Sequence, residues 1–433
     1  MKIDGFMQLG RRFFLLQTGT TLSLLTAHVF RFALAWWCLQ ETHSAVAFSS
    51  LIAFSVATEV YLKPFLAAFG DQFHRGKFIL SGQCIVFIVI VLLSLACSAG
   101  YFHLVAVTAG LVVISAVASA REPTIMGLIP DLVAEGEVSR AIASRSAINS
   151  VIALSAPLLV ASLVGLFSAS VALYVAVVLQ GFSCLAFALL MKSAMPAHPA
   201  HKSASWLSKT REGFRAIYHV KSERYIALIS ALINFTLFPF FSVAVPYWII
   251  TQLHLSPWYL GAFECSFALG LLSGSLYFNR VLSTGMGRFG TVIVGFVCLG
   301  GSVMGIVVVA NMTASIALAF FSGLAFIFIN VNLSTLRSIA TPGHYRARMA
   351  AMAAFLSSLA NPFGVIIAGW YLHWLGVTLF AVACGVVVML MALVLLWSSH
   401  LKKALSLDER EMKGYYQKTY PAAFRERGEK RPA

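Results

Sequence analysis

The sequence has few charged residues. Asp, Glu, Lys and Arg together make up 11% of the 433 residues, whereas a soluble globular protein contains roughly 25%. The hydrophobic residue types reach 59% of the chain, which is more apolar surface than one compact core can bury. This composition excludes an ordinary soluble enzyme or binding domain and indicates that lipid surrounds much of the chain.

Motifs for metal binding, disulfide formation and catalysis are also lacking. The seven cysteines lie singly within apolar runs, with no CxxC pair and no His–Cys cluster. We therefore expect no disulfide framework, no metal site and no cofactor. The GxSxG, HExxH and Walker signatures are missing from the contexts that they need. Their lack argues against an enzyme and against primary active transport.

What the sequence does contain is a series of twelve apolar runs, each long enough to cross a bilayer as a helix. The expected spans are residues 13–39, 45–69, 78–99, 103–129, 144–167, 170–191, 225–250, 257–279, 289–310, 313–336, 349–370 and 374–398. The pattern predicts an all-α membrane protein with two six-helix bundles, residues 1–191 and 225–398. A basic linker, residues 192–224, joins them, and a basic tail, residues 399–433, follows.

The basic residues lie at one side of the expected spans. Lys and Arg total 31 against 16 Asp and Glu, and 28 of the 31 fall in the N-terminus, the linker, the tail or loops on their side. Arg145 and Arg337 are among those assigned to loops. By the positive-inside rule both termini are cytoplasmic, in a multi-pass protein that we place in a bacterial inner membrane. We expect the tail to be solvated and to face anionic lipid rather than nucleic acid.

The two halves share a local pattern. Pro157 in the fifth expected span and Pro362 in the eleventh lie 205 residues apart, and each follows a basic segment that opens a helix rich in small residues. Proline within a span is expected to kink it. A duplicated six-helix unit is the plan of many secondary transporters, whose substrate sites lie near the middle of the membrane.

The loop between the second and third spans resembles a signature of the major facilitator superfamily. It reads Gly70-Asp71-Gln-Phe-His-Arg75-Gly-Lys77, where the family has G-x-L-a-D-R-x-G-R-K. The match is partial, with Gly70, Asp71, Arg75 and Lys77 in place. The resemblance implies a tight cytoplasmic turn in which Asp71 pairs with a cation and clamps the loop in one transport state.

Two further segments resemble the macrolide-efflux and enterobactin-exporter branch of that superfamily, the drug:proton antiporter-3 family. They are Pro123-Thr-Ile-Met-Gly-Leu-Ile-Pro130-Asp-Leu-Val and Glu264-Cys-Ser-Phe-Ala-Leu-Gly270-Leu-Leu-Ser-Gly274. The resemblance covers nearly the whole chain. It implies a monomeric secondary transporter for a small-molecule substrate, in a branch that exports macrolides, other drugs and siderophores.

Charged residues within the expected spans are Arg31, Glu59, Lys63, Arg121, Glu122 and Glu264, while Arg145, at the very start of the fifth span, is counted with the loop before it. A charge at the bilayer centre costs about 2.5–3.5 kcal/mol, so each is expected to be paired or functional. Glu59 and Lys63 are four residues apart, which is the spacing of an ion pair on one helix. Arg121 and Glu122 are adjacent, so they point in different directions.

His28 and Arg31 share one face of the first span because they are three residues apart. Arg31 is therefore expected to face the substrate or to pair with Glu122 of the fourth span. Glu264 has no Lys or Arg in its own helix before Arg280. A carboxylate in such an environment gains and loses a proton readily, so Glu264 is the leading candidate for proton coupling, with Glu59 and Glu122 behind it.

Three asparagines are neutral candidates for the substrate site. Asn234 lies in the seventh expected span, and Asn330 and Asn332 lie in the tenth, on different sides of the helix. The alternative role for each is a hydrogen bond between neighbouring helices.

The leading interpretation is a proton-coupled exporter of an amphipathic small molecule, such as a drug or macrolide. The alternative is an exporter or importer of a siderophore or of another anionic metabolite or lipid, favoured by Arg31, Arg121 and His28. A non-transporting receptor or an enzyme is the least expected. The partners expected are the solute, the proton and the lipid bilayer.

Overall fold

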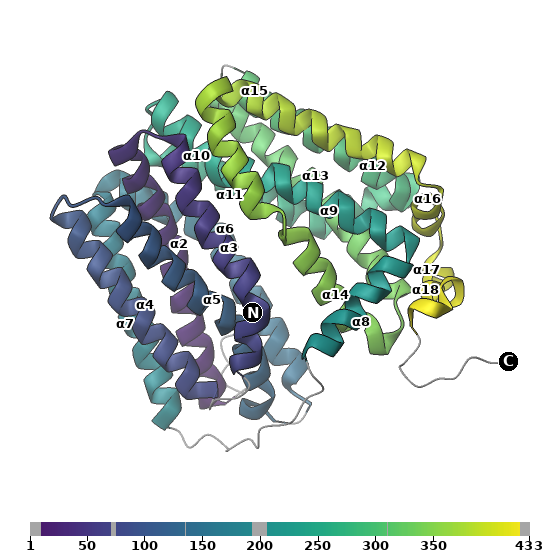
Figure 1. Cartoon of the computed structure of the whole chain (residues 1–433), viewed down its shortest axis with the longest axis horizontal. Helices are drawn as coiled ribbons and strands as arrows, with labels where there is room; N and C mark the ends of the chain where they lie inside the picture. The colour runs from purple at the N-terminus through teal and green to yellow at the C-terminus, as the bar shows by residue number, and fades with distance from the viewer. Residues whose placement is uncertain (1–9, 71–74, 135, 193–205, 310, 425–433) are drawn as a thin grey trace. The chain divides into compact units, whose positions relative to one another are not determined.

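The computed structural model describes residues 10–70, 75–134, 136–192, 206–309 and 311–424. Within these ranges every regular element is a helix and no strand is present (Figure 1). The predicted all-α class is therefore confirmed. The clamp residue Asp71 lies outside the described residues.

The chain divides into two compact units, each assembled from several stretches of sequence. Unit 1 comprises Met1–Lys202, Ser242–Cys265 and Val365–His373, and unit 2 comprises Ser203–Phe241, Ser266–Gly364 and Trp374–Ala433. Unit 1 thus includes two segments of the later half of the chain. The two bundles proposed from the sequence, residues 1–191 and 225–398, stay a prediction.

Long helices make up the first half of the chain. They are α2 (Arg11–Thr42), α3 (Ala45–Gly70), α4 (Arg75–Ser98), α5 (Leu104–Leu132), α6 (Val138–Leu166) and α7 (Ala169–Lys192). Each covers one of the first six expected spans to within one residue. Pro123 and Pro130 lie inside α5 and Pro157 inside α6, where neighbouring helices can satisfy the freed backbone carbonyls.

Helices interrupted by π-helical turns and breaks make up the later half. They are α8 (Trp206–His219), α9 (Lys221–Pro239), the π-helix η1 (Phe240–Ala244), α10 (Val245–Tyr247), the π-helix η2 (Trp248–Gln252), α11 (Pro257–Ser273), the π-helix η3 (Gly274–Phe278), α12 (Asn279–Val308), α13 (Met312–Ala340), α14 (Gly343–Ser358) and α15 (Asn361–Trp397). The tail adds α16 (Ser399–Leu405), α17 (Glu409–Met412), α18 (Tyr415–Thr419) and the 3₁₀ turn η4 (Pro421–Ala423).

Ten helical stretches of the described residues are long and apolar enough to cross a membrane. Two of them, Pro257–Val308 and Arg348–Trp397, are 52 and 50 residues long, whereas one span needs about 20 residues. Each double-length stretch therefore holds two of the expected spans. Gly287 at φ 75° and Gly376 at φ 77° break these stretches, because glycine adopts a left-handed conformation without a Cβ clash.

The eleventh span differs from its prediction. Pro362 does not kink a continuous helix but stands at the start of α15, just after α14 has ended at Ser358. Proline suits a first helical turn because the N–H that it lacks would have no partner there. The correspondence with Pro157, which lies inside α6, is therefore one of sequence position and not of local geometry.

Close packing of α2 on α7 builds the core of unit 1, and apolar residues of α5 join it. Phe13 of α2, Ile125 and Ile129 of α5 and Phe187 of α7 are all fully buried in one cluster. Gly19 lets α7 approach, since a Cβ at that position would lie 2.9 Å from the Phe187 ring. This core holds the ends of α2 and α5 that carry the polar side chains described below.

In unit 2, α11 and α13 approach each other backbone to backbone. A Cβ at Gly270 would overlap the carbonyl oxygen of Phe320, and one at Gly323 would overlap that of Phe267. Gly270 belongs to the segment that resembles the exporter branch. Small residues at such crossings are typical of membrane helices, where close van der Waals packing drives association.

The linker and the tail are structured where they are described. Glu212 of α8 pairs with Arg348 of α14 at 2.7 Å. In the tail, Met412 and Tyr416 are fully buried, and the Gly414 N–H donates to the carbonyl oxygen of Ile339 in α13 at 3.3 Å. Apolar side chains of its short helices thus pack onto unit 2, whereas its basic residues stay exposed, as expected for a solvated segment: Lys402, Lys403, Arg410, Lys413 and Lys418.

Candidate functional site

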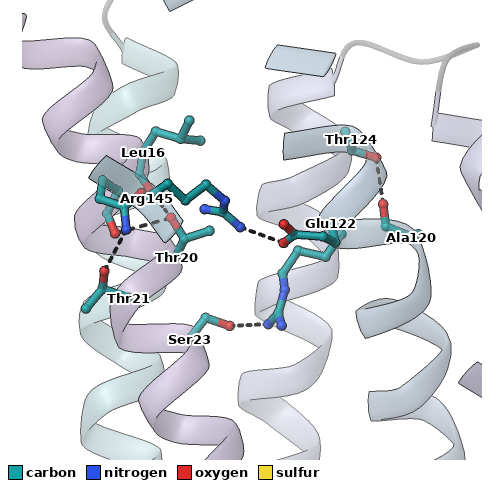
Figure 2. A network of polar contacts seen from close by, with 10 residues as sticks. Leu16, Thr20, Thr21, Ser23, Ala120, Glu122, Thr124 and Arg145 are labelled. Atoms are coloured by element: carbon teal, nitrogen blue, oxygen red, sulfur yellow. Dashed lines mark hydrogen bonds and ion pairs between the residues drawn. The ribbon is translucent and has the colours of Figure 1, made fainter. Parts of the chain in front are cut away.

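A polar centre lies inside unit 1 where α2, α5 and α6 meet (Figure 2). Arg145 of α6 donates from Nη2 to the Glu122 carboxylate of α5 at 2.5 Å. The adjacent Arg121 donates from Nη1 to Ser23 Oγ of α2, also at 2.5 Å. The two neighbouring side chains of α5 therefore bind different helices.

Arg145 is the residue of this centre that the sequence placed wrongly. It was assigned to a loop, but it lies inside α6 with 4% of its side chain exposed, while Glu122 is 45% exposed. Nε and Nη1 of Arg145 are buried without a hydrogen-bond partner among the described residues. A buried guanidinium with two unused donors can accept a new partner at little cost.

Buried amides extend the centre and were missed by the sequence reasoning. Ser23 Oγ donates to Gln83 Oε1 at 3.1 Å, and Gln180 Nε2 donates to the same oxygen at 2.7 Å. Gln180 also donates to the Gln83 carbonyl at 3.1 Å. Glutamine in an apolar run was the available signal, because a buried amide needs partners. The chain Arg121–Ser23–Gln83–Gln180 thus crosses α5, α2, α4 and α7.

Arg31 and His28 of α2 lie near Glu264 of α11 within unit 1. Arg31 is exposed, whereas His28 and Glu264 are half-buried. Arg31 interacts electrostatically with both Glu264 and His28. The sequence offers Glu264 no cation on its own helix before Arg280, and the cation comes from α2 instead.

Two expected ion pairs are not found among the described residues. Glu59 and Lys63 are both exposed and form no salt bridge with each other. Glu59 interacts electrostatically with Arg121 instead. Arg31 does not pair with Glu122, because Arg145 occupies that carboxylate. Spacing along one helix favoured these pairs, but the neighbouring helices supplied other partners.

The signature loop is described only at its edges. Gly70 ends α3 and Arg75 begins α4. Arg75 Nη1 donates to the Gly127 carbonyl of α5 at 2.7 Å and lies 3.6 Å from the Asp131 carboxylate. Lys77 is exposed. Arg75 therefore ties the start of α4 to the end of α5, and Asp131 is a partner that the sequence reasoning did not single out.

Unit 2 contains a cavity of about 230 Å³. Its lining comes from α9 (Ile226, Ser230, Ile233, Asn234), α13 (Phe326, Ile329, Asn330, Leu333, Ser334, Arg337) and α14 (Ala350, Ala353, Ala354, Ser357). Two of the three predicted asparagines, Asn234 and Asn330, are thus brought together. Asn332 takes the alternative role, since it is buried and donates to Asn279 Oδ1 of α12 at 2.8 Å.

An ion pair borders this cavity. Arg337 of α13 donates from Nε to Glu223 Oε2 of α9 at 2.8 Å, and the Tyr416 hydroxyl donates to Glu223 Oε1 at 2.9 Å. The Glu223 side chain has no exposed surface, and that of Arg337 is 18% exposed. Burial, followed by the adjacent Glu223 carboxylate, raises the pKa of Tyr416 well above its usual value of 10.0, so its phenol stays protonated and donates.

No group of three or more His, Cys, Asp or Glu side chains that could hold a metal ion occurs in the described ranges. The cysteines are free, and Cys38 and Cys384 are buried. The polar side chains of the two units are thus arranged for hydrogen bonding and ion pairing.

A family comparison decides the class of protein. Residues 16–365 match the model of the Major Facilitator Superfamily. The chain belongs to the major facilitator superfamily. It is a transporter and not an enzyme, as the sequence predicted.

Solved transporters of this superfamily share the fold. The chain is similar to the peptide transporter POT in complex with sulfate at 13% identity and a TM-score of 0.69, with 92% of this chain and 98% of that chain covered. It is similar to the nucleoside transporter NupG at 12% identity and a TM-score of 0.70, with 89% and 98% covered. No curated protein sequence matches the chain. At these identities the likeness concerns the fold alone.

Proposed function

We propose that this major facilitator transporter exports an amphipathic small molecule in exchange for protons, with Glu264 as the proton-coupling carboxylate. It acts as a monomer in a bacterial inner membrane with both termini in the cytoplasm. The one-sided distribution of Lys and Arg supports this orientation. The resemblance of the Glu264–Gly274 segment to the exporter branch supports the direction of transport.

The observation that carries the proposal is the interaction of Glu264 with Arg31 across two helices. Ionised Glu264 is attracted to the guanidinium, whereas protonated Glu264 is not. Gain of a proton therefore removes this attraction, and loss of the proton restores it. Arg31 is exposed and can turn to a solute or to His28 when it is released. One proton then changes the arrangement of α2 against α11.

The cavity of unit 2 supports an amphipathic solute. Its walls combine the apolar Ile226, Ile233 and Phe326 with the polar Asn234 and Asn330. Apolar walls with a few placed polar groups are the usual composition of small-molecule sites. A hydrophilic solute would leave these apolar walls without a partner.

A siderophore or another anionic metabolite is the second candidate. It is favoured by one observation, the guanidinium of Arg337 on the cavity wall. A macrolide-like cation or neutral solute would gain nothing from that charge. The two candidates differ in the charge of the solute and share the coupling mechanism.

The experiment is transport in proteoliposomes with an imposed pH gradient, run with a panel of labelled macrolides and siderophores. Glu264→Gln keeps the shape and hydrogen bonding of the protonated carboxyl. We expect it to abolish transport driven by the pH gradient and to leave solute exchange at equal pH intact. The matched control is Glu41→Gln, an exposed carboxylate near the end of α2, which should leave both activities unchanged.

Intact gradient-driven transport in Glu264→Gln would refute its role and direct attention to Glu59 and Glu122. Transport of every accepted solute without any effect of the pH gradient would refute proton coupling itself.

A further inference from the structure

The tail of unit 2 reaches the cavity through three side chains. Tyr416 is fully buried and donates to one oxygen of Glu223, and the other oxygen accepts from Arg337, which lines the cavity. Tail and cavity wall are thus joined by two consecutive hydrogen bonds through one buried carboxylate. The tail is also fixed by Arg288 of α12, which pairs with Glu409 at 2.7 Å.

The Glu223 carboxylate binds both Arg337 and Tyr416, and this sharing determines which donor groups of Arg337 remain for the cavity. Its carboxylate could accept two parallel bonds from a guanidinium, the geometry that such pairs favour. The Tyr416 hydroxyl occupies Oε1, so Arg337 makes its bond through Nε to Oε2 alone. No hydrogen bond from Nη1 or Nη2 of Arg337 to another described residue is present. These terminal amino groups remain available at the cavity.

The neighbourhood of Arg337 suits a group with several acceptor atoms. Ser334 lies three residues before Arg337 on α13, so the two share one face of the helix. Ser230, Asn330 and Ser357 add hydroxyl and amide groups to the same cavity. Arg337 is the one charged side chain among the described residues that line this cavity.

We propose that the cavity of unit 2 binds the anionic group of the transported solute, a carboxylate or similar oxyanion, at Arg337, and that Tyr416 is a positioning residue that acts through Glu223. The proposal rests on the proposed export function only for the statement that the ligand is the transported solute, and it favours the second, anionic candidate over a neutral or cationic solute. The tail thereby helps to determine which solutes the transporter accepts. Tyr416 touches no solute itself.

The test measures charge preference without a known solute. Ser334→Cys is introduced into full-length protein whose seven cysteines have been replaced, and its labelling rate is measured in detergent. The probes are two methanethiosulfonate reagents, ethylsulfonate, which is anionic, and ethyltrimethylammonium, which is cationic. The ratio of the two rates, divided by the ratio at the exposed Thr313→Cys near the other end of α13, reports the charge in the cavity.

Four substitutions then separate the roles. Arg337→Gln should lower the anionic preference by roughly tenfold, because it removes the charge beside the reporter. Tyr416→Phe should lower it by about threefold, because a free Oε1 lets Glu223 draw both sides of the guanidinium away from the cavity. Glu223→Gln should raise it, because the charge of Arg337 is then unopposed. Tyr415→Phe, the neighbouring ring, should leave it unchanged.

Tyr416→Phe is expected to lower the labelling ratio and Glu223→Gln to raise it. These opposite directions distinguish a positioning role of Tyr416 from a general disordering of the tail. If both lower the ratio, the substitutions only disorder the tail and the positioning role is wrong. If Tyr416→Phe matches Tyr415→Phe, the hydroxyl has no role. If Arg337→Gln leaves the ratio unchanged, the cavity does not bind anions. None of these outcomes depends on proton coupling, so they are independent of the test of Glu264.

Discussion

The two units each contain an ion pair with one buried member, and the pairs are built in opposite ways. In unit 1 the arginine is the buried member, with Arg145 4% exposed against 45% for Glu122. In unit 2 the carboxylate is the buried member, with Glu223 fully buried against 18% for Arg337. Glu223 has a partner on each oxygen, whereas two nitrogen atoms of Arg145 have no partner in the part of the chain that the structure describes.

The difference separates a fixed pair from one that can exchange partners. A buried carboxylate bonded on both oxygens has no unused acceptor atom for which a new group would compete. A buried guanidinium with unused donors gains from any new acceptor that arrives. We infer that unit 2 holds its charges in place beside a cavity. We infer further that unit 1 gathers the charges that rearrange during transport, with Arg31 and Glu264 proposed among them.

The largest effect is expected from Arg337→Met. It leaves the Glu223 carboxylate fully buried with only the Tyr416 hydroxyl, and breaking a buried pair in this way costs about 3–5 kcal/mol. The measurement is the free energy of unfolding in a denaturing detergent titration. Arg280→Met, an exposed arginine of α12, is the control and should cost little. If Arg337→Met loses no more unfolding free energy than the control, the Arg337–Glu223 pair does not stabilise unit 2.

A smaller loss is expected from Glu122→Ala. It removes the one hydrogen-bond partner that the buried Arg145 has among the described residues, and a hydrogen bond to a charged group is worth about 1.5–3 kcal/mol. The same detergent titration measures it. A loss of unfolding free energy equal to that of Arg337→Met would mean that both ion pairs are fixed, and the two units would then not differ in this respect.

The reciprocal substitution, Arg145→Met, should cost less than Glu122→Ala. The carboxylate that it leaves behind is 45% exposed, so water can solvate it, and the cost should stay below about 1 kcal/mol. Titrating both variants side by side gives the order directly. If Arg145→Met lost more stability than Glu122→Ala, the assignment of Arg145 as the buried member of the pair would be wrong.

The smallest effect concerns pH. Burial raises the pKa of Tyr416 well above 10.0, so the folded state holds this proton more tightly than the unfolded state does. The contribution of Tyr416 to stability is complete below pH 10 and is lost as the pH rises above 10 towards the folded pKa. The difference in Tm between the native chain and Tyr416→Phe should therefore be constant from pH 7 to about pH 9 and shrink above pH 10. A constant difference up to pH 11 would contradict the assignment.

The membrane helices could be predicted from the sequence because apolar runs of span length leave few other structures possible. Their ends were less certain, and this is where the site was misjudged. Arg145 and Arg337 were assigned to loops, but both lie inside helices whose ends differ by several residues from the expected spans. When the predicted end of a helix is wrong by about two turns, an arginine expected in water can lie in a buried ion pair instead.

Partners on other helices could not be read from spacing along one helix. Glu264 and Glu59 were judged by their own helices, whereas Arg31 and Arg121 act on them from α2 and α5. The docked tail was missed for a related reason. Its helices α17 and α18 are four and five residues long, too short to form without the surface on which they pack.

The central claim is that Glu264 carries the proton that exchanges with the solute. The most direct measurement is proton movement into the lumen of proteoliposomes, followed with an enclosed pH-sensitive dye after an accepted solute is added at equal pH. The native chain should produce a change in pH that Glu41→Gln keeps and that Glu264→Gln abolishes while its solute exchange continues. An unchanged proton signal in Glu264→Gln, with normal solute movement, would contradict the claim.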